Sequence, residues 1–175
     1  MTVGLVDAPA GVLARARRVA ATVLDPEVPV LTIDDLGILR EVRLAADGAI
    51  EVDLTPTYSG CPAVEAIEQD VRSALVGAGF ALVRVRRVLS PAWTTDWMTA
   101  EGRRKLTEYG IAPPPGTSAA VGPVSVSLGR RPALVRCPQC GSSDTAELSR
   151  FGSTACKSLW RCHACREPFD HFKAH

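Results

Sequence analysis

The apolar residues in the first part of the chain recur at the spacing of an amphipathic helix. Between residues 12 and 24 they repeat every three or four positions, with arginines largely between them. Pro26 and Pro29 then end this helix, because proline cannot continue one. A second stripe of the same period covers residues 62–78, and a further helix is predicted near residues 99–109.

Strand patterns lie between the first two helices and after the second one. Residues 38–44 and 49–55 are predicted as strands, and Asp47-Gly48 between them is a tight hairpin signal. Residues 82–89 are rich in valine but also contain arginines, so the pattern does not say which face of that strand is buried. Two helices packed against a short sheet predict an α+β domain.

The remainder of the chain has a different composition. Residues 113–123 hold four prolines and two glycines, which is typical of a linker. The part of the chain after this linker has many cysteines and few large aliphatic residues, so it needs a metal ion or a similar cross-link to fold. Short strands over 145–151 and 158–161 make it small and β-rich. We therefore expect a first domain, a linker and a second domain at residues 1–112, 113–133 and 134–175.

Composition and charge narrow the class of protein. The chain has 175 residues, of which 46% are hydrophobic and 22% charged, as in a folded protein. The net charge is +1, so no overall field selects nucleic acid or a membrane as partner. We see neither a leader-peptide pattern nor an apolar run long enough to span a bilayer. We therefore expect a cytoplasmic protein with reduced thiols.

Four cysteines form two CxxC pairs. Cys137 and Cys140 make the first pair, and Cys162 and Cys165 make the second, with 21 residues between the pairs. One CxxC turn can place two sulfurs on a metal ion, and two turns supply the four thiolates that structural zinc prefers. The alternative is two separate pairs, redox-active or unligated. In a reducing compartment the sequence favours one structural Zn²⁺ held by all four residues.

Other potential ligands lie close to these pairs. Cys156 comes six residues before Cys162, and His163, His171 and His175 follow. Any of them could replace a thiolate. Because four thiolates already close a tetrahedral site, we interpret Cys156 as a small buried residue and the histidines as surface groups.

Cys61 is the one cysteine of the predicted first domain. Pro62 suits the first position of the second helix, which would put Cys61 at the N-cap. There the helix dipole and the free N–H groups favour a thiolate, although Glu65 and Glu68 partly offset that field. An ordinary buried cysteine fits the residues equally well.

Asp25 and Glu27 flank Pro26 and place two carboxylates on a rigid corner. They could bind a metal, act as acid and base, or face water, which is the commonest outcome for such charges. The sequence has no glycine-rich phosphate loop, no Ser-His-Asp signature and no HExxH motif. The residues therefore favour a protein that is not an enzyme.

Several motifs resemble two related families. The segments 25–30 and 35–38, and the loop 57–62 that contains Cys61, resemble the small domain of SufT-type iron–sulfur assembly factors. Four further motifs resemble the PaaD family of the phenylacetyl-CoA epoxidase system, at residues 93–97, 110–114, 151–157 and 168–173. Together these motifs cover nearly the whole chain.

The PaaD resemblance implies a SufT-like iron–sulfur assembly domain followed by a zinc ribbon, in an accessory protein of aerobic phenylacetate degradation. The epoxidase of that pathway uses a di-iron oxygenase subunit and a reductase with an iron–sulfur cluster. The resemblance implies help in maturing these metal centres, with Asp25, Glu27 and Cys61 as the residues that hold iron or a cluster transiently. It also implies the reductase, the oxygenase and iron–sulfur assembly proteins as partners, and it allows a homodimer.

Two other functions compete with maturation. The chain could be a stable, non-catalytic subunit of the epoxidase, which would remain in the complex at fixed stoichiometry. It could also be a zinc-ribbon nucleic-acid-binding module. Residues 129–175 carry only four more basic than acidic residues and lack clustered basic and aromatic motifs. We therefore expect neither nucleic acid nor a membrane as partner.

Overall fold

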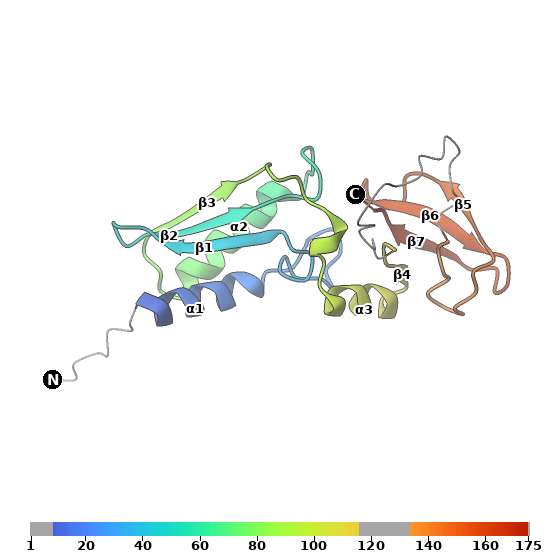
Figure 1. The fold of residues 1–175 in the computed structure, drawn as a ribbon, viewed down its shortest axis with the longest axis horizontal. Helices are drawn as coiled ribbons and strands as arrows, with labels where there is room; N and C mark the ends of the chain where they lie inside the picture. The colour runs from blue at the N-terminus through green and yellow to red at the C-terminus, as the bar shows by residue number, and fades with distance from the viewer. Residues whose placement is uncertain (1–8, 116–133, 175) are drawn as a thin grey trace, which may run out of the picture. The chain divides into compact units, whose positions relative to one another are not determined.

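The computed structural model describes residues 9–115 and 134–174 (Figure 1). The chain divides into two compact units, residues 1–93 and residues 94–175. Residues 116–133, which make up most of the predicted linker, lie outside the described residues. Across the described part of the chain, no helix is both long and apolar enough to cross a membrane.

The first unit has the predicted α+β architecture. Its elements are α1, β1, β2, α2 and β3, at Pro9–Ala21, Leu39–Leu44, Ile50–Leu54, Val64–Gly77 and Val83–Arg87. β1 and β2 form an antiparallel hairpin, and α2 returns the chain so that β3 pairs in parallel with β2. Gly48 at the hairpin turn has a φ of 83°, a conformation that glycine adopts without strain.

Two helices bury the apolar side of this sheet. α1 contacts β1, α2 contacts β3, and the helices contact each other. The buried side chains come from the helical stripes and from inward strand positions: Ala16, Ala20, Val52, Leu54, Val64, Ile67, Val71 and Leu75. Trp93 is buried as well, and its Nε1 donates a hydrogen bond to the carbonyl of Leu36 at 2.9 Å. Removal of this apolar surface from water is the main source of the unit's stability.

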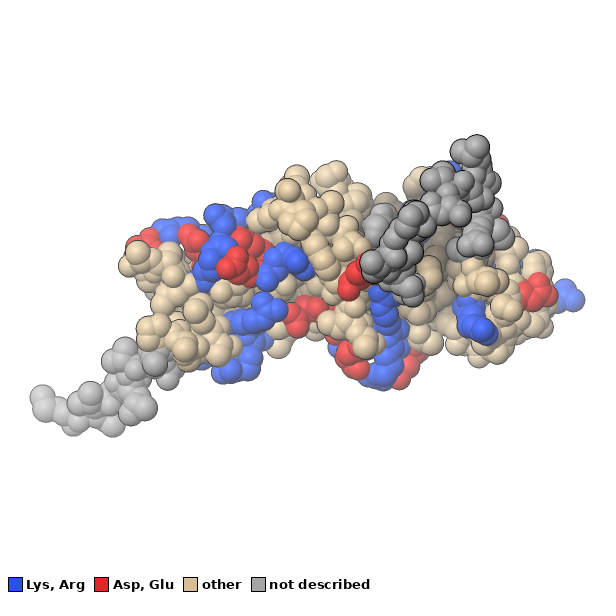
Figure 2. Space-filling model, in the orientation of Figure 1, with Lys and Arg blue, Asp and Glu red and all other residues tan. Residues whose placement is uncertain are grey.

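Paired charges cover the outer side of the sheet. Asp53 of β2 accepts hydrogen bonds from Arg43 of β1 at 2.8 Å and from Arg86 of β3 at 2.9 Å. Arg84 of β3 pairs with Asp47 in the hairpin turn. Figure 2 shows basic and acidic side chains intermixed over this region. Arg84 and Arg86, whose orientation the sequence left open, therefore lie on the outer face with carboxylate partners.

The second unit joins a short helical segment to a small sheet. Its elements are η1, α3, β4, β5, β6 and β7, at Thr95–Trp97, Ala100–Glu108, Ile111–Ala112, Thr145–Ser149, Lys157–Cys162 and Pro168–Phe172. The strand order is β4-β7-β6-β5, antiparallel except for the parallel pair β4-β7. Thr99 caps the predicted helix by accepting the N–H of Gly102 at 2.9 Å.

The pairing of β4 with β7 shifts the boundary predicted at residue 112. Ala112 lies opposite His171, so residues that precede the predicted linker belong to the sheet of the second unit. The sequence pattern predicts neither strand. β4 has two residues, too few for a periodic pattern. β7 buries the consecutive residues His171 and Phe172, so its apolar and polar positions do not alternate.

Candidate functional site

Two tight turns bring the four cysteines of the second unit together. In the first turn, the N–H of Gly141 donates to the carbonyl of Cys137 at 2.9 Å. Gly141 has a φ of 75°, which explains why glycine suits this position. In the second turn, Cys162 ends β6 and Cys165 follows before β7 begins. Each turn thereby presents its two sulfurs on the same side.

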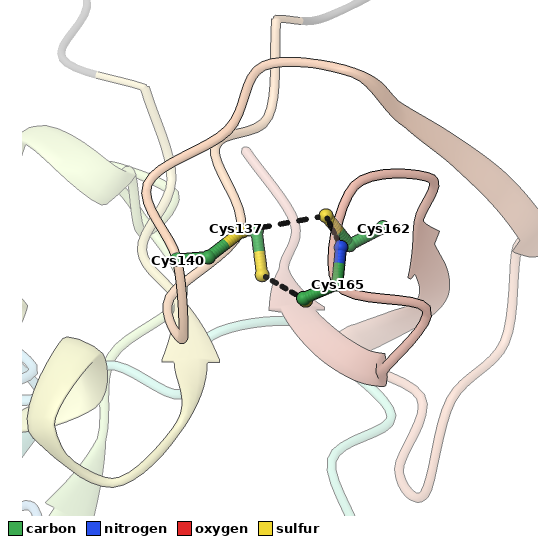
Figure 3. Close-up of side chains that lie close together, drawn as sticks. All are labelled: Cys137, Cys140, Cys162 and Cys165. Atoms are coloured by element: carbon green, nitrogen blue, oxygen red, sulfur yellow. Dashed lines mark hydrogen bonds between the residues drawn. The ribbon is translucent and has the colours of Figure 1, made fainter.

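The four sulfur atoms converge on one point (Figure 3). All four Sγ atoms lie within 4.8 Å of one another, with 3.7 Å between Cys137 and Cys165 and 3.6 Å between Cys140 and Cys162. Thiolates at about 2.3 Å from a tetrahedral Zn²⁺ are about 3.8 Å apart. The residues therefore fit zinc, and four thiolates leave no open position for substrate.

The surroundings favour metal binding by this cluster. Trp160 and Phe169 are buried and pack with Cys137 and Cys162. The backbone N–H of Cys165 lies 3.5 Å from the Sγ of Cys162 and is the main cause that lowers the pKa of that thiol to about 7. Against the N–H of Glu167, burial and the neighbouring thiols raise the pKa of Cys165 to about 12, so without a metal the four thiols do not ionise together. Because the thiolate is the form that binds metal, the turn itself prepares a ligand.

Cys156 lies outside the cluster. It is 4% exposed, and its Sγ lies 3.0 Å from the Oγ1 of Thr154. Among the described residues, the metal-binding group contains the four CxxC cysteines and not Cys156. The interpretation of Cys156 as a small buried residue is therefore confirmed.

The prediction that the histidines are surface groups is wrong for His171. His163 is exposed, but His171 is 5% exposed because it lies within β7 and packs edge-on against Trp160, with ring centroids 5.7 Å apart. Burial lowers the pKa of His171 to about 4, so its imidazole is neutral near pH 7. His175 lies outside the described residues.

Asp25 and Glu27 lie in a closed loop after α1. The N–H of Asp25 donates to the carbonyl of Leu31 at 2.9 Å. The Oδ1 of Asp25 accepts the N–H groups of Glu27 and Val28, each at 2.8 Å. Asp25 is 6% exposed rather than a solvated corner charge, and Glu27 is half-buried. Asp25 thus fixes the loop, and the loop positions Glu27.

Cys61 lies two residues before the N-cap of α2, not at the cap as predicted. The helix begins at Val64 and Ala63 is its N-cap, because residues 61–63 form a turn in which the N–H of Val64 donates to the carbonyl of Cys61. The N–H groups of Ala63 and Val64 are nevertheless directed to the Cys61 sulfur and lower its pKa. Cys61 is half-buried. Part of the predicted helix-start effect is therefore present.

The predicted preference of Cys61 for the thiolate is wrong in this structure. Burial is the largest cause, and it raises the pKa of the thiol above its usual value; the N–H of Ala63 opposes this effect. The negative charges of Glu27 and then Asp25 raise the pKa further. The two carboxylates of the acid loop therefore act electrostatically on the thiol that precedes α2.

Cys61, Asp25 and Glu27 make a looser group than the four cysteines. Of the residues in the described ranges, only the four-cysteine cluster brings three or more ligand atoms within 4.8 Å of one another. One thiol beside two carboxylates also mixes soft and hard ligands. The group is therefore suited to weak or partial coordination of a cation and not to a closed cage.

Two family models match separate parts of the chain. Residues 14–86 match an iron–sulfur cluster assembly protein family, and residues 122–173 match the PaaD zinc beta ribbon domain. The first match contains Asp25, Glu27 and Cys61. The second contains all four cysteines of the cluster, so the sulfur cluster lies in a zinc-ribbon domain.

Curated proteins and a solved structure extend these matches. The chain is 52% identical over 149 residues, 85% of each sequence, to an Escherichia coli (strain K12) protein named as a subunit of 1,2-phenylacetyl-CoA epoxidase. It is 37% identical over 90 residues, 51% of this chain and 85% of the relative, to an Fe-S protein maturation auxiliary factor of Porphyromonas gingivalis. A domain of unknown function from Bacillus anthracis has the same fold, with a TM-score of 0.52 and 23% identity over 56% of this chain and 93% of that structure.

Proposed function

The chain belongs to the PaaD family of phenylacetyl-CoA epoxidase subunits, and from this premise we propose that it is an accessory factor in the maturation of that enzyme. Its first unit would assist the assembly of an iron–sulfur cluster or another iron centre in the reductase or oxygenase subunit. Its partners would be these subunits and iron–sulfur assembly proteins. The metal is the cargo of this process and not a resident cofactor of the first unit.

One observation carries the proposal: the charges of two carboxylates act on the single cysteine of the assembly-type domain. Burial first, and then the charges of Glu27 and Asp25, raise the pKa of Cys61 above a value at which a thiol is already protonated at neutral pH. A bound cation reverses this effect, because it neutralises the carboxylates and displaces the thiol proton. The group thus becomes a good ligand set only when iron arrives.

The same arrangement favours release. Oxygen ligands hold thiophilic iron less firmly than a full set of thiolates does. A client site with several cysteines would therefore withdraw the metal from Cys61, Glu27 and Asp25. The supporting chemistry is that of a transient carrier.

The four-cysteine cluster would have a different role. We propose that Cys137, Cys140, Cys162 and Cys165 hold one structural Zn²⁺ that stabilises the second unit. The support is the sulfur geometry, the burial of Cys137 and Cys162, and the zinc-ribbon match. A closed site of this kind does not exchange metal readily with a client.

The test compares epoxidase produced with wild-type protein and with Cys61→Ser. We expect the variant to fold and to keep its zinc, while iron and sulfide in the reductase, or iron in the oxygenase, fall at least about tenfold. Cys156→Ser is the matched control, since it removes a cysteine outside both groups. Wild-type metal content with Cys61→Ser would remove Cys61 from the mechanism.

Two further measurements separate the competing roles. A stable non-catalytic subunit would co-purify with the epoxidase at fixed stoichiometry, whereas a maturation factor would leave once the metal centres are complete. We also propose that the chain is not itself an enzyme. Purified protein given phenylacetyl-CoA, oxygen and a reductant is expected to form no product, and turnover without the other epoxidase components would overturn this part of the proposal.

A further inference from the structure

A cavity opens on the sheet of the second unit, and its lining does not include the four cysteines. Its volume is about 460 Å³. The buried residues that line it are Ser158, Trp160 and His171, and the exposed ones include Arg150 and Phe151. A cavity of this size accommodates a large apolar side chain with room for neighbouring groups.

An exposed aromatic ring borders this cavity. Phe151 is 69% exposed, and the Nζ of Lys173 lies 4.9 Å from the centroid of its ring. The same ammonium donates to the backbone carbonyl of Arg150 at 3.2 Å. This hydrogen bond holds Lys173 in place, and Lys173 in turn restrains the ring of Phe151. A large aromatic side chain held in place on the surface beside a cavity is typical of the anchor of a protein interface.

The cavity wall also contains an incomplete hydrogen-bond network. The Nε1 of Trp160 donates to the Oγ of Ser158 at 2.9 Å, and the Nδ1 of His171 lies 3.3 Å from that oxygen. The Nε2 of His171 is buried without a partner among the described residues. Because buried polar atoms in folded proteins are normally paired, this nitrogen indicates that a group from outside completes the site.

The charges around the cavity select the sign of the occupant. Arg150 and Lys173 line it together with a single acidic residue, Glu147. Over residues 134–174 the chain has six Lys or Arg and four Asp or Glu. The two cations of the lining outnumber its one carboxylate, so the cavity favours an acidic group.

We propose that this face docks an acidic segment of a partner protein. An apolar side chain of the segment fills the cavity beside Trp160, and a polar group of the same segment hydrogen-bonds the Nε2 of His171. A carboxylate of the segment approaches Lys173 and Arg150. A protein is favoured over a small molecule because the exposed ring of Phe151 extends the apolar surface beyond the cavity, and a ligand inside the cavity would leave that ring uncovered.

The experiment measures binding of purified epoxidase reductase and oxygenase subunits to the full chain. The proposed function enters this test only because it suggests these two proteins as binding partners. We expect at least one of these two proteins to bind wild-type protein. Phe151→Ser should weaken binding at least about tenfold, as for an interface anchor, and Lys173→Gln should weaken it several-fold and reduce its dependence on salt. Both side chains lie at the surface, so neither change should alter zinc content.

Matched controls use exposed residues of the same unit. Tyr109→Ser removes another exposed aromatic residue, and Arg104→Gln removes another exposed arginine; neither residue lines the cavity. Both variants should bind like wild type. The proposal is overturned if neither the reductase nor the oxygenase binds wild-type protein, or if Phe151→Ser binds as tightly as Tyr109→Ser. It is also overturned if cross-linking at residue 151 captures a basic segment of the partner.

This test separates docking from metal transfer. Cys61→Ser should bind the epoxidase components normally and yet fail to support maturation. Phe151→Ser should bind at least about tenfold more weakly while Cys61 remains chemically intact. If Cys61→Ser matures the client normally but Phe151→Ser still loses binding, Cys61 has no part in maturation and the docking surface stands. If the client is fully metallated without this protein but Phe151→Ser loses binding, the maturation function fails and the docking surface stands.

Discussion

The two units use cysteine sulfur in opposite ways. In the second unit, four thiols lie within 4.8 Å of one another, and Cys137 and Cys162 are buried among apolar side chains. In the first unit, the single thiol of Cys61 is half-buried, and this burial, followed by the charges of Glu27 and Asp25, raises its pKa. A full set of soft ligands suits permanent binding, whereas one soft ligand with two hard ones suits exchange.

The units also differ in what stabilises them. The first buries many aliphatic side chains between its helices and its sheet, so we expect it to fold without metal. The second unit has fewer large buried aliphatic residues, and two cysteines of the cluster belong to its core. The comparison predicts that the second unit requires its metal to fold, whereas the first unit binds metal only transiently. Four changes test this contrast.

Loss of one cluster ligand should have the largest effect. Cys162→Ser is expected to release the zinc and unfold the second unit, because apparent binding free energies of structural zinc are on the order of 10–16 kcal/mol. Elemental analysis and proteolysis would show a metal-free, digested tail beside an intact first unit. Cys156→Ser should keep one zinc per chain. A Cys162→Ser tail that resists protease would contradict a structural role for the metal.

A cavity in the core of the first unit should produce the next largest effect. Leu75 is fully buried in α2, and Leu75→Ala should lower the free energy of unfolding of this unit by about 3 kcal/mol. Val76 is 53% exposed, so Val76→Ala should cost well under about 1 kcal/mol. Denaturant unfolding monitored in the first unit gives both values. Equal costs would show that apolar packing is not what stabilises this unit.

The ion pairs on the outer face of the sheet should contribute less. The hydrogen bond from Arg86 lowers the pKa of Asp53. Burial opposes this effect, and Arg43 lowers the pKa further. The stability that these ion pairs provide is fully present above the pKa of Asp53 in the unfolded chain, about 3.9. It is lost as the pH falls through the lower pKa of Asp53 in the folded protein. Asp53→Asn should therefore cost about 1–2 kcal/mol at neutral pH, with the difference from wild type shrinking below about pH 4. Asp70→Asn, at an exposed position, should change neither quantity.

The smallest effect concerns the reactivity of Cys61. Because Glu27 raises the pKa of Cys61, Glu27→Gln should lower it and increase the fraction of thiolate. Alkylation of Cys61 near pH 8, followed by peptide mass spectrometry, should be about threefold faster than in wild type. Glu41→Gln, an exposed change on β1, should leave the rate unchanged. An unchanged or slower rate in Glu27→Gln would contradict an electrostatic effect of the carboxylate on the thiol.

Periodic elements and short-range motifs were predictable from the sequence. The helices and strands of the first unit follow apolar patterns of the expected period, and the spacing of Cys137, Cys140, Cys162 and Cys165 indicated the sulfur cluster. That the acid loop could act on Cys61 was a hypothesis from the sequence, and the charges of Glu27 and Asp25 do act on this thiol. These features are set by local geometry or by a few residues of distinctive chemistry.

Features that depend on tertiary contacts were not predictable. The pKa of Cys61 is raised because burial and two carboxylates outweigh the N–H groups of Ala63 and Val64, and only the folded loop fixes that balance. The burial of His171 depends on β7 and its pairing with β6. Histidine is seldom fully buried in folded proteins, so the residue type alone indicated a surface position for His171.

The two-residue strand β4 determines where this protein can be truncated without loss of solubility. The zinc-ribbon match begins at residue 122, after β4, so an expression fragment with that boundary would lack Ile111 and Ala112. β7 would then become an edge strand, with its outer backbone N–H and C=O groups uncovered next to Phe169 and Phe172. Such an edge pairs readily with other chains, so the isolated ribbon would tend to aggregate even with its zinc bound. A fragment that starts before α3 should remain monodisperse.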